Sequence, residues 1–370
     1  MRPLPVIHDP VFTEPSSYSF FDKIGLALIR DKRDLPFIYT TLKITFFMAL
    51  PGVALFFFPA SSWLWWIAAG YYFFVNNLVF KGPFGLMLHC TSHRRFFKQK
   101  YNFLNHYLPW VISPFFGQTP ETYASHHLGM HHVENNLEDD ESSTMQYQRD
   151  SFSDFMRYFL NFLIRGFIDT VKYFDIRKIY KLRDKVIRGE IIFFLAVIGL
   201  SFVHWQATLV VFILPFFISR FVMMLGNFAQ HSFVDFDDPG NNYKNSVNCI
   251  NTPYNKKCWN DGYHIDHHNQ PSLHWTLYPV HFQEHLDEFA KHKAFVFEGI
   301  DFLKVWILLM KKDYATLVSR LVNINGAFKS DEEAIALMKS RTRKMPKRGI
   351  TMKSLKLAKT SAGRTIQTMG

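Results

Sequence analysis

The apolar residues of the 370-residue chain gather in two long stretches. The first, residues 44–80, contains no charged side chain, and the second, residues 191–230, contains only Arg220. A helix rises about 1.5 Å per residue, so about 20 residues cross the hydrocarbon core of a bilayer. Each stretch is therefore long enough for two membrane spans, and the alternative, a buried hairpin of a soluble protein, fits this pattern less well.

Turn-forming and polar residues divide each stretch in two. The sequence PASS at 59–62 separates the halves of the first stretch, and HWQ at 204–206 separates those of the second. When the first stretch is extended back to Phe37 across Lys43, the pattern predicts two helical hairpins. Their four spans are expected at about 37–58, 63–80, 191–204 and 207–226.

The basic residues predict the orientation of these hairpins. Lys and Arg are frequent before the first span, between the hairpins and after the second hairpin, whereas both short turns contain none. Positively charged loops remain in the cytosol. We therefore expect an all-α, polytopic membrane protein with both termini in the cytosol and a helical cytosolic cap formed by 81–190 and 231–310. No secretory signal peptide is expected, and the first span would serve as the signal anchor.

Other segments have less regular patterns. Residues 101–116 are apolar but short and contain two prolines, which predicts an interfacial, re-entrant or cap segment. Residues 152–174 are rich in aromatic side chains with Arg157, Arg165 and Lys172 interspersed, as expected of an amphipathic helix lying on the membrane. Residues 134–141 are acidic and rich in Asn, which predicts a solvated loop. The domain boundaries that follow are 1–36 for a cytosolic N-terminal segment, 37–310 for the membrane domain and 311–370 for a basic, partly disordered tail.

Composition narrows the function classes. The formal net charge is +11, but it falls to +2 without the nine Lys and Arg residues of 341–370, a segment that contains no acidic residue and is expected to be disordered. This basicity is that of a membrane-facing tail, and no nucleic-acid partner is expected. Three cysteines with no CxxC pair exclude a disulfide scaffold and a cysteine-based zinc or redox motif.

The 17 histidines are the unusual feature of the composition, because most of them are clustered. Residues three or four apart lie on one face of a helix, so each cluster can direct its imidazoles to one place. The clusters are His89 and His93 (HxxxH), His127, His131 and His132 (HxxxHH), and His264, His267 and His268 (HxxHH), with Asn227 and His231 repeating the spacing of four. The isolated His8, His106, His204 and His292 are expected to be ordinary polar residues.

Imidazole is a good ligand for zinc, copper, iron and nickel. Eight or nine histidines exceed the capacity of one ion, so the spacing predicts two ions that share the set. The chain has no HExxH, GxSxG or GxxxxGK[ST] motif and no Glu-x-x-His pairs, which removes zinc hydrolysis, serine hydrolysis, nucleotide binding and the carboxylate-bridged di-iron bundle. A redox-active metal pair in a membrane protein points to iron and O2.

At the segments FGLMLHCTSHRRFF, GNFAQHS and NDGYHIDHH the chain resembles the membrane fatty acid desaturase and hydroxylase superfamily, over roughly residues 37–300. The resemblance implies an enzyme that uses two iron ions (Fe2+/Fe3+) and O2 to remove hydrogens from a fatty acyl chain in a lipid or acyl-CoA. It implies no catalytic residue beyond the metal ligands. Those ligands would be His89, His93, His127, His131, His132, His231, His264, His267 and His268, with Asn227 as a further ligand, directly or through water.

Polar residues beside the motifs are candidates to orient these ligands through hydrogen bonds. They are His126, Asp261, Asp266, His281 and His285. A helix cap or surface carboxylate is the alternative role for the two aspartates. His126 adjoins His127, and we prefer His127 as the ligand because its partner four residues later is His131.

The chain departs from many members of the superfamily in three ways. Its third motif begins with His264 where the fused front-end desaturases have Gln, it reads NQPSLHW after that motif where many acyl desaturases read LFP, and it contains no HPGG haem-binding segment. The resemblance therefore implies a separate electron donor, cytochrome b5 or ferredoxin. The expected location is the endoplasmic reticulum in a eukaryote, or a chloroplast or bacterial inner membrane.

Two alternatives remain open at this point. A hydroxylase or ketolase acting on a carotenoid, sterol, sphingolipid or alkane would use the same histidine motifs. A non-catalytic membrane metal-binding protein or transporter would place polar residues inside the spans to form a pathway. Only Lys43 and Arg220 interrupt the predicted spans, which disfavours the transporter.

Overall fold

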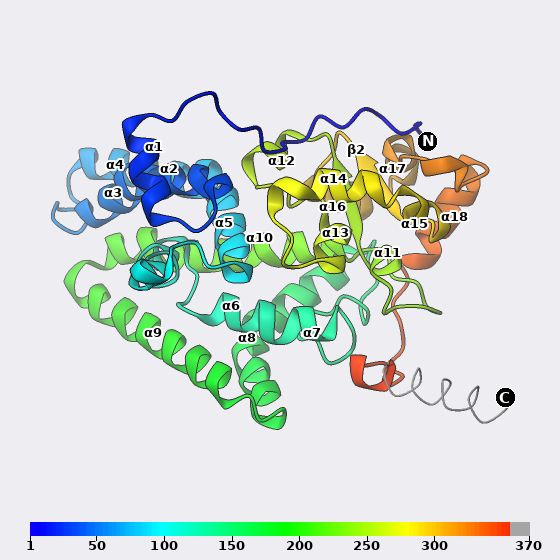
Figure 1. The fold of residues 1–370 in the computed structure, drawn as a ribbon. Helices are drawn as coiled ribbons and strands as arrows, with labels where there is room; N and C mark the ends of the chain where they lie inside the picture. Colours follow the sequence, from blue (N-terminus) through cyan, green and yellow to red (C-terminus); the bar gives the residue numbers. More distant parts are fainter. Residues whose placement is uncertain (356–370) are drawn as a thin grey trace.

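The computed structural model describes residues 1–355 and is mostly helical, as Figure 1 shows. The N-terminal helices are α1 (Phe20–Leu28), α2 (Leu35–Ile44), α3 (Leu50–Ala54), α4 (Trp63–Phe74), α5 (Lys81–His93), α6 (Thr122–His126), α7 (His132–Glu134), α8 (Phe152–Ile176), α9 (Tyr180–Thr208) and α10 (Leu214–Gln230). The C-terminal elements are α11 (Asn242–Asn245), β1 (Val247–Ile250), α12 (Pro253–Lys257), α13 (His264–Asn269), α14 (Tyr278–Glu284), α15 (Leu286–Lys291), β2 (Phe295–Glu298), α16 (Phe302–Met310), α17 (Tyr314–Arg320) and α18 (Asp331–Arg341). The prediction of a helical protein is confirmed, apart from one pair of short strands.

The first apolar stretch forms a hairpin of two long helical runs. A π-helical turn, Thr45–Ala49, joins α2 to α3, and another, Val75–Phe80, joins α4 to α5. Trp65 Nε1 donates to the carbonyl of Leu55 at 2.9 Å and so closes the turn between the two runs. The turn lies where the sequence predicts it.

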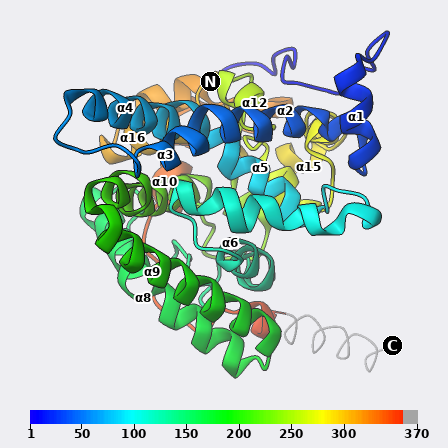
Figure 2. The ribbon, with the colours of Figure 1, turned by 90° about the vertical axis from the view of Figure 1, so that its left-hand side faces the viewer.

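The second apolar stretch is a 51-residue helical run from Tyr180 to Gln230 that bends sharply at His204 (φ −157°, ψ 90°). The bend confirms the turn predicted at 204–206. The His204 ring stacks on Trp65, with centroids 5.6 Å apart, and its Nε2 donates to the carbonyl of Phe58 at 3.0 Å. The two hairpins therefore meet at their tips, and Figure 2 views the molecule from this end.

Many apolar side chains around the hairpins face outward, and Phe202 is 88% exposed. An apolar surface of this kind suits contact with lipid. Among the described residues, two runs are long and apolar enough to cross a membrane, Lys32–Ala54 and Tyr180–Gln230. The run through α4 and α5 is as long, but Asn76 and Asn77 interrupt its apolar sequence. The structure thus supports membrane association, while the number of spans stays a prediction.

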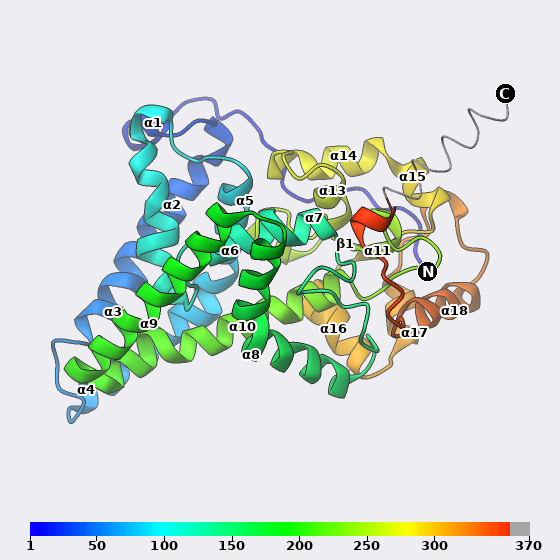
Figure 3. The ribbon, with the colours of Figure 1, turned by 90° about the horizontal axis from the view of Figure 1, so that it is seen from below.

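Helices α8 and α10 connect the hairpins to the cap. Figure 3 shows α8 lying against α9 and α10, and α10 running on from the second hairpin to α16. Aromatic side chains fill these junctions, with Phe155 packed on Phe228 and on Trp306 at centroid distances of 5.3 and 4.9 Å. The long helix α8 was predicted from the sequence at 152–174.

The strands β1 and β2 form a parallel pair in which Val247 lies opposite Phe295. Asn248, on β1, accepts a hydrogen bond from the backbone N–H of Ile265 at 2.8 Å and donates to Asp266 at 2.7 Å. Both partners lie in the first turn of α13, which contains the HxxHH motif. The strand pair therefore fixes the position of the third histidine cluster.

Two expectations about loops were wrong. Residues 134–141 are not a solvated loop, since Glu134, Asn136 and Asp140 are buried. Internal hydrogen bonds hold several of their polar groups, because Asn136 Nδ2 donates to Asn245 and Asp140 accepts from the backbone N–H of Asn136. The acidic composition of the segment concealed a buried hydrogen-bond network.

The start of the predicted disordered tail is also ordered. Arg341 and Met345 are buried, and Arg341 donates to Asp235 at 2.9 Å. The reason is Arg149, which is fully buried and donates to six backbone carbonyls, two of them at Arg341 and Arg343. These bonds hold the segment after α18 against the cap. The remaining part of the predicted tail, 356–370, lies outside the described residues.

Candidate metal centre

The nine histidines of the predicted ligand set converge on two adjacent positions. Each histidine offers one ring nitrogen as a candidate ligand atom, and within each group these nitrogens all lie within 4.8 Å of one another. The five-histidine group consists of His89, His93, His127, His132 and His267, and the four-histidine group consists of His131, His231, His264 and His268. Each group takes residues from segments far apart in the chain, so the fold, and not local spacing alone, forms both.

The two groups are interleaved. The helical segment at 127–132 contributes His127 and His132 to the first group and His131 to the second, while α13 contributes His267 to the first and His264 and His268 to the second. Neighbouring residues of one helix point about 100° apart. A single HxxxHH or HxxHH motif can therefore supply two positions, and the rings of His131 and His132 have centroids 5.8 Å apart.

The Nε2 atoms face one another inside each group. In the five-histidine group the Nε2 of His267 lies 3.0 Å from that of His89 and 2.9 Å from that of His132. In the four-histidine group the Nε2 of His264 lies 3.1 Å from those of His231 and His268. Donors at about 2.1 Å from one ion and adjacent in its coordination sphere are about 3 Å apart.

The outward-facing Nδ1 atoms establish which tautomer these rings adopt. His231 Nδ1 lies 2.9 Å from the carbonyl oxygen of Asn245, and because a carbonyl only accepts, Nδ1 carries the proton. His131 Nδ1 likewise donates to the carboxylate of Asp140 at 2.8 Å. Nε2 of these two rings is then a bare lone pair that is available to a cation. The donor set therefore fits a metal ion in each group.

Burial keeps the imidazoles neutral. Desolvation, reinforced by the neighbouring His131, lowers the pKa of His231 to about 3. Desolvation and the neighbouring His89 lower the pKa of His93 to about 3 as well. Burial and the surrounding imidazoles hold the pKa of His264 and of His267 well below the usual range. All four rings have free lone pairs at neutral pH, as metal binding requires.

Asp140 is a site residue that the sequence did not reveal. Burial opposes the ionisation of its carboxyl, but the adjacent His131 outweighs this and lowers its pKa. Asp140 also accepts from the N–H and the hydroxyl of Ser142, at 2.9 and 2.7 Å. A carboxylate that orients a metal-binding histidine in this way raises the basicity of the imidazole. No spacing pattern marks Asp140. It lies in the acidic segment 134–141, for which the sequence predicts a solvated loop.

Tyr278 is a second residue that the sequence did not reveal, since its hydroxyl lies 2.9 Å from His267 Nδ1. Asp261 Oδ1 lies 3.5 Å from His89 Nδ1, but its hydrogen bonds come from Tyr254 and Gln230, so its orienting role stays a prediction. Asp266 instead contacts His281, at 2.6 Å, and His281 stacks on His285. His281 therefore packs against α13, and neither His281 nor His285 belongs to the two groups.

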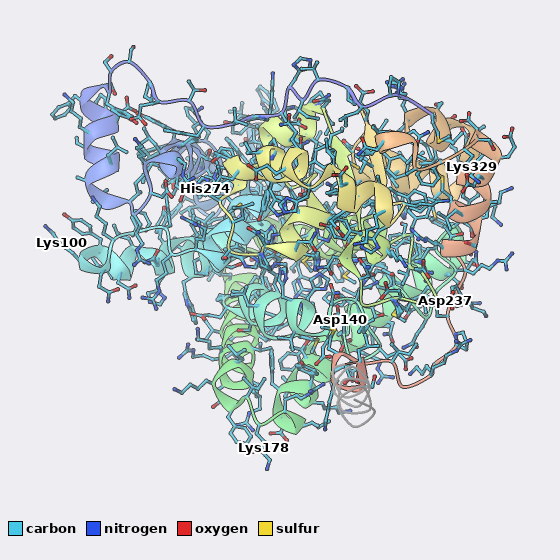
Figure 4. The ribbon with its side chains drawn as sticks, turned by 45° about the vertical axis from the view of Figure 1, so that its right-hand side comes forward. Lys100, Asp140, Lys178, Asp237, His274 and Lys329 are labelled. Carbon is cyan, nitrogen blue, oxygen red and sulfur yellow. The ribbon has the colours of Figure 1, made fainter. Side chains whose placement is uncertain are left out.

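His126 and Asn227 lie beside the groups without joining them. The His126 ring packs edge-on against Phe162, and burial lowers its pKa to about 4. Asn227 Nδ2 donates to the carbonyl of Ser142 at 2.8 Å and to the hydroxyl of Tyr158 at 2.7 Å. Ligation by Asn227 stays a prediction. Figure 4 labels Asp140 and His274, both of which are buried.

An apolar cavity of about 250 Å³ reaches both histidine groups. His89 and His127 of the first group and His131 and His264 of the second line it. The rest of the wall comes largely from α5 and α10, with Phe84, Phe116, Val222, Met223, Met224, Leu225, Phe302 and Leu303 among the apolar residues. The cavity is therefore able to place a hydrocarbon chain beside both groups.

A second apolar cavity, of about 380 Å³, adjoins the first and lies between α8, α9 and α10. The two cavities share Gln118, Tyr123, His126, Phe162 and Met223 in their walls. The outer wall includes Ile191, Leu195 and Ile198, which are exposed on the apolar face of the second hairpin. We call these the inner and outer cavities.

Comparison with known proteins agrees with this geometry. A family model described as "Fatty acid desaturase" matches residues 64–299, more than half of the chain. No curated protein and no solved structure matches the chain significantly. The matched range includes all nine histidines of the two groups. The chain therefore belongs to the fatty acid desaturase family, an assignment that the resemblance in the sequence motifs had predicted.

Proposed function

We propose that this fatty acid desaturase family member is a membrane oxidoreductase that uses O2 to insert a double bond into a fatty acyl chain of a lipid or acyl-CoA. The observation that carries the proposal is the inner cavity, which is apolar along most of its wall and is lined by histidines of both groups. An apolar chain in this cavity would lie beside both metal positions, where water is largely excluded.

The two histidine groups would each hold one iron ion. Imidazole suits iron, and the nine rings supply nitrogen donors without any carboxylate bridge. With O2 and two electrons from a donor protein, the bound iron would supply an oxidant able to break unactivated C–H bonds. In the balanced reaction the acyl chain loses two hydrogen atoms. One O2, two protons and two electrons are also consumed, and two water molecules form.

The chain's own residues would position the substrate. The outer cavity would admit an acyl chain from the bilayer between α8 and α9, and the shared wall at Tyr123 and Phe162 would guide it into the inner cavity. Asp140 and Tyr278 would keep the imidazoles of His131 and His267 in place. The depth of the cavity beyond the metal positions would then determine which bond is oxidised.

This function requires the predicted membrane arrangement. We propose four spans in two hairpins, with the histidine groups and both termini on the cytosolic side of the membrane. The outward-facing apolar side chains around both hairpins support such an arrangement. Cytochrome b5 or ferredoxin would deliver electrons to the cap.

The proposal is tested by lipid analysis of a host that expresses the wild type, His268→Ala or His8→Ala under 18O2. His8 is exposed and lies outside both groups, so its replacement is a matched control. We expect a new double bond with no 18O in the product from the wild type and from His8→Ala, and no product from His268→Ala. Inserted 18O would identify a hydroxylase or ketolase instead, and the absence of any oxidised lipid from iron-loaded protein would favour a non-catalytic metal-binding protein.

A further inference from the structure

One charged side chain in the inner cavity has no role in the function proposed so far. Lys81 directly follows the second predicted span and opens α5. A lysine at the edge of a span usually extends its ammonium group to water. Lys81 instead turns inward and is only 8% exposed, and it lines the inner cavity.

Within the described residues 1–355, Lys81 has no carboxylate within 4.0 Å. Its ammonium donates to the hydroxyl of Ser219 at 2.8 Å and lies 3.5 Å from the carbonyl of Phe116. The hydroxyl of Ser219 also donates to that carbonyl. An ammonium has three donors, so at least one remains available to a molecule in the cavity.

The other buried cation near the cavities differs in this respect. Arg220 lines the outer cavity but lies 3.6 Å from the carboxylate of Glu190 and donates to the carbonyl of Gly117 at 3.0 Å. Its charge is therefore compensated by the fold. A buried charge without a counter-ion is costly, and burial lowers the pKa of Lys81 to about 7. An anionic group bound in the cavity would therefore be stabilised most beside Lys81, because it would supply the missing counter-ion.

The cavity connects Lys81 to the metal positions along one face of α5. Gly85 lies one turn after Lys81, and His89 lies one turn after Gly85, so Lys81 and His89 are about 12 Å apart along the helix. Both Gly85 and the facing Gly226 line the cavity, and a Cβ at either would meet no atom within 4 Å. Open space therefore extends between the ammonium and the histidines.

We propose that Lys81 and Ser219 form a binding site for the oxygen-bearing end of the substrate, a carboxylate on a long hydrocarbon chain. A chain anchored there would extend past Gly85 and present a fixed carbon to the two histidine groups. The inference rests on the proposed reaction but changes its substrate. The carboxyl of a lipid or acyl-CoA is esterified and carries no charge, so this site assigns the reaction to free long-chain carboxylates instead.

The test is a binding measurement that needs no turnover. Purified full-length protein in detergent is titrated with hexadecanoate and with the matched alkane, hexadecane, by displacement of a fluorescent hydrocarbon probe. We expect the wild type to bind the carboxylate about tenfold to a hundredfold more tightly than the alkane, because hydrogen bonds to charged groups contribute this much. Lys81→Met should lose this preference and still bind the alkane.

Controls separate the binding site from a merely structural role. Lys100→Met removes an exposed lysine outside the cavity, visible at the edge of the molecule in Figure 4, and should keep the preference. Ser219→Ala should weaken the preference with Lys81 in place, which covers the case in which Lys81→Met fails to fold. Equal affinity for carboxylate and alkane in the wild type, or an unchanged preference in folded Lys81→Met, would overturn the proposal. Since neither readout involves oxidation, its failure is distinct from failure of the proposed function.

Discussion

At the scale of single residues, the most informative side chains are those that hold the imidazoles from behind. His131 is oriented by Asp140, His231 by the carbonyl of Asn245 and His267 by Tyr278. The contacts of His131 and His231 leave Nε2 free and directed into a group, because the carboxylate and the carbonyl can only accept. The ligand residues themselves follow from the spacing of the sequence motifs, but their orientation depends on these contacts from distant segments.

Replacement of Asp140 by Asn should weaken metal binding in the four-histidine group. The amide keeps the shape but loses the charge that makes His131 a better donor, and changes of this kind cost about tenfold to a hundredfold in affinity. Iron retention against a chelator measures the effect. Asp237→Asn is the control, since Asp237 is exposed and belongs to neither histidine group. Figure 4 labels both aspartates. Equal iron retention in both variants would exclude an orienting role for Asp140.

Glu141 provides a prediction about pH. Burial, with a contribution from Asp169, raises the pKa of its carboxyl from 4.5 to about 8. The folded state therefore binds a proton more tightly than the unfolded state, and this group's contribution to stability falls as pH rises from 4.5 to 8. Glu141→Gln should raise the unfolding temperature relative to wild type more at pH 8 than at pH 5. If the two unfolding temperatures differ by the same amount at pH 5 and pH 8, the Glu141 carboxyl is ionised in the folded protein at both pH values.

At the scale of elements, the helices were predictable where the sequence pattern is long and regular. The hairpin turns at 59–62 and 204–206 and the amphipathic helix α8 follow from apolar runs that local residues define. The segment at 134–141 was misjudged because its burial depends on partners such as Asn245, over 100 positions later in the chain. Local composition cannot indicate a partner at that separation.

The inner cavity leads to a prediction about α5. Gly85 faces open space between Lys81 and His89, so Gly85→Leu should fill the cavity there. We expect weaker binding of long chains, a shift toward shorter substrates and unchanged iron content. Gly199→Leu is the matched control, because Gly199 also faces open space but is exposed on α9. Identical chain-length profiles for the two variants would contradict this path for the substrate.

At the scale of the whole molecule, buried polar contacts join the cap to the segment after α18. Arg149→Met would leave several buried carbonyls without donors, each costing about 1–3 kcal/mol, so a loss of more than about 3 kcal/mol of stability is expected. Arg157→Met, which removes an exposed ion pair, should cost at most about 1 kcal/mol. Thermal unfolding in detergent compares the two, and similar unfolding temperatures would mean that Arg149 does not hold the segment.

The sequence motifs predicted nine histidine ligands, Asn227 as a further ligand and two ions, but not how the histidines divide between the ions. The division into groups of five and four depends on the crossing of α5, α10, α13 and the segment at 127–132, which no spacing rule specifies. Arg149 was equally unpredictable, because a basic residue in a connector is ordinarily solvated. Both features arise from tertiary packing.

The central claim is that two separate histidine groups each bind one iron ion. The most direct measurement is the iron content of purified, iron-loaded protein for the wild type, His267→Ala, His264→Ala and His8→Ala. We predict about two ions per chain for the wild type and His8→Ala, and about one for each variant that disrupts a single group. The claim would be contradicted by a single ion in the wild type, or by iron contents that do not change when His267 or His264 is replaced.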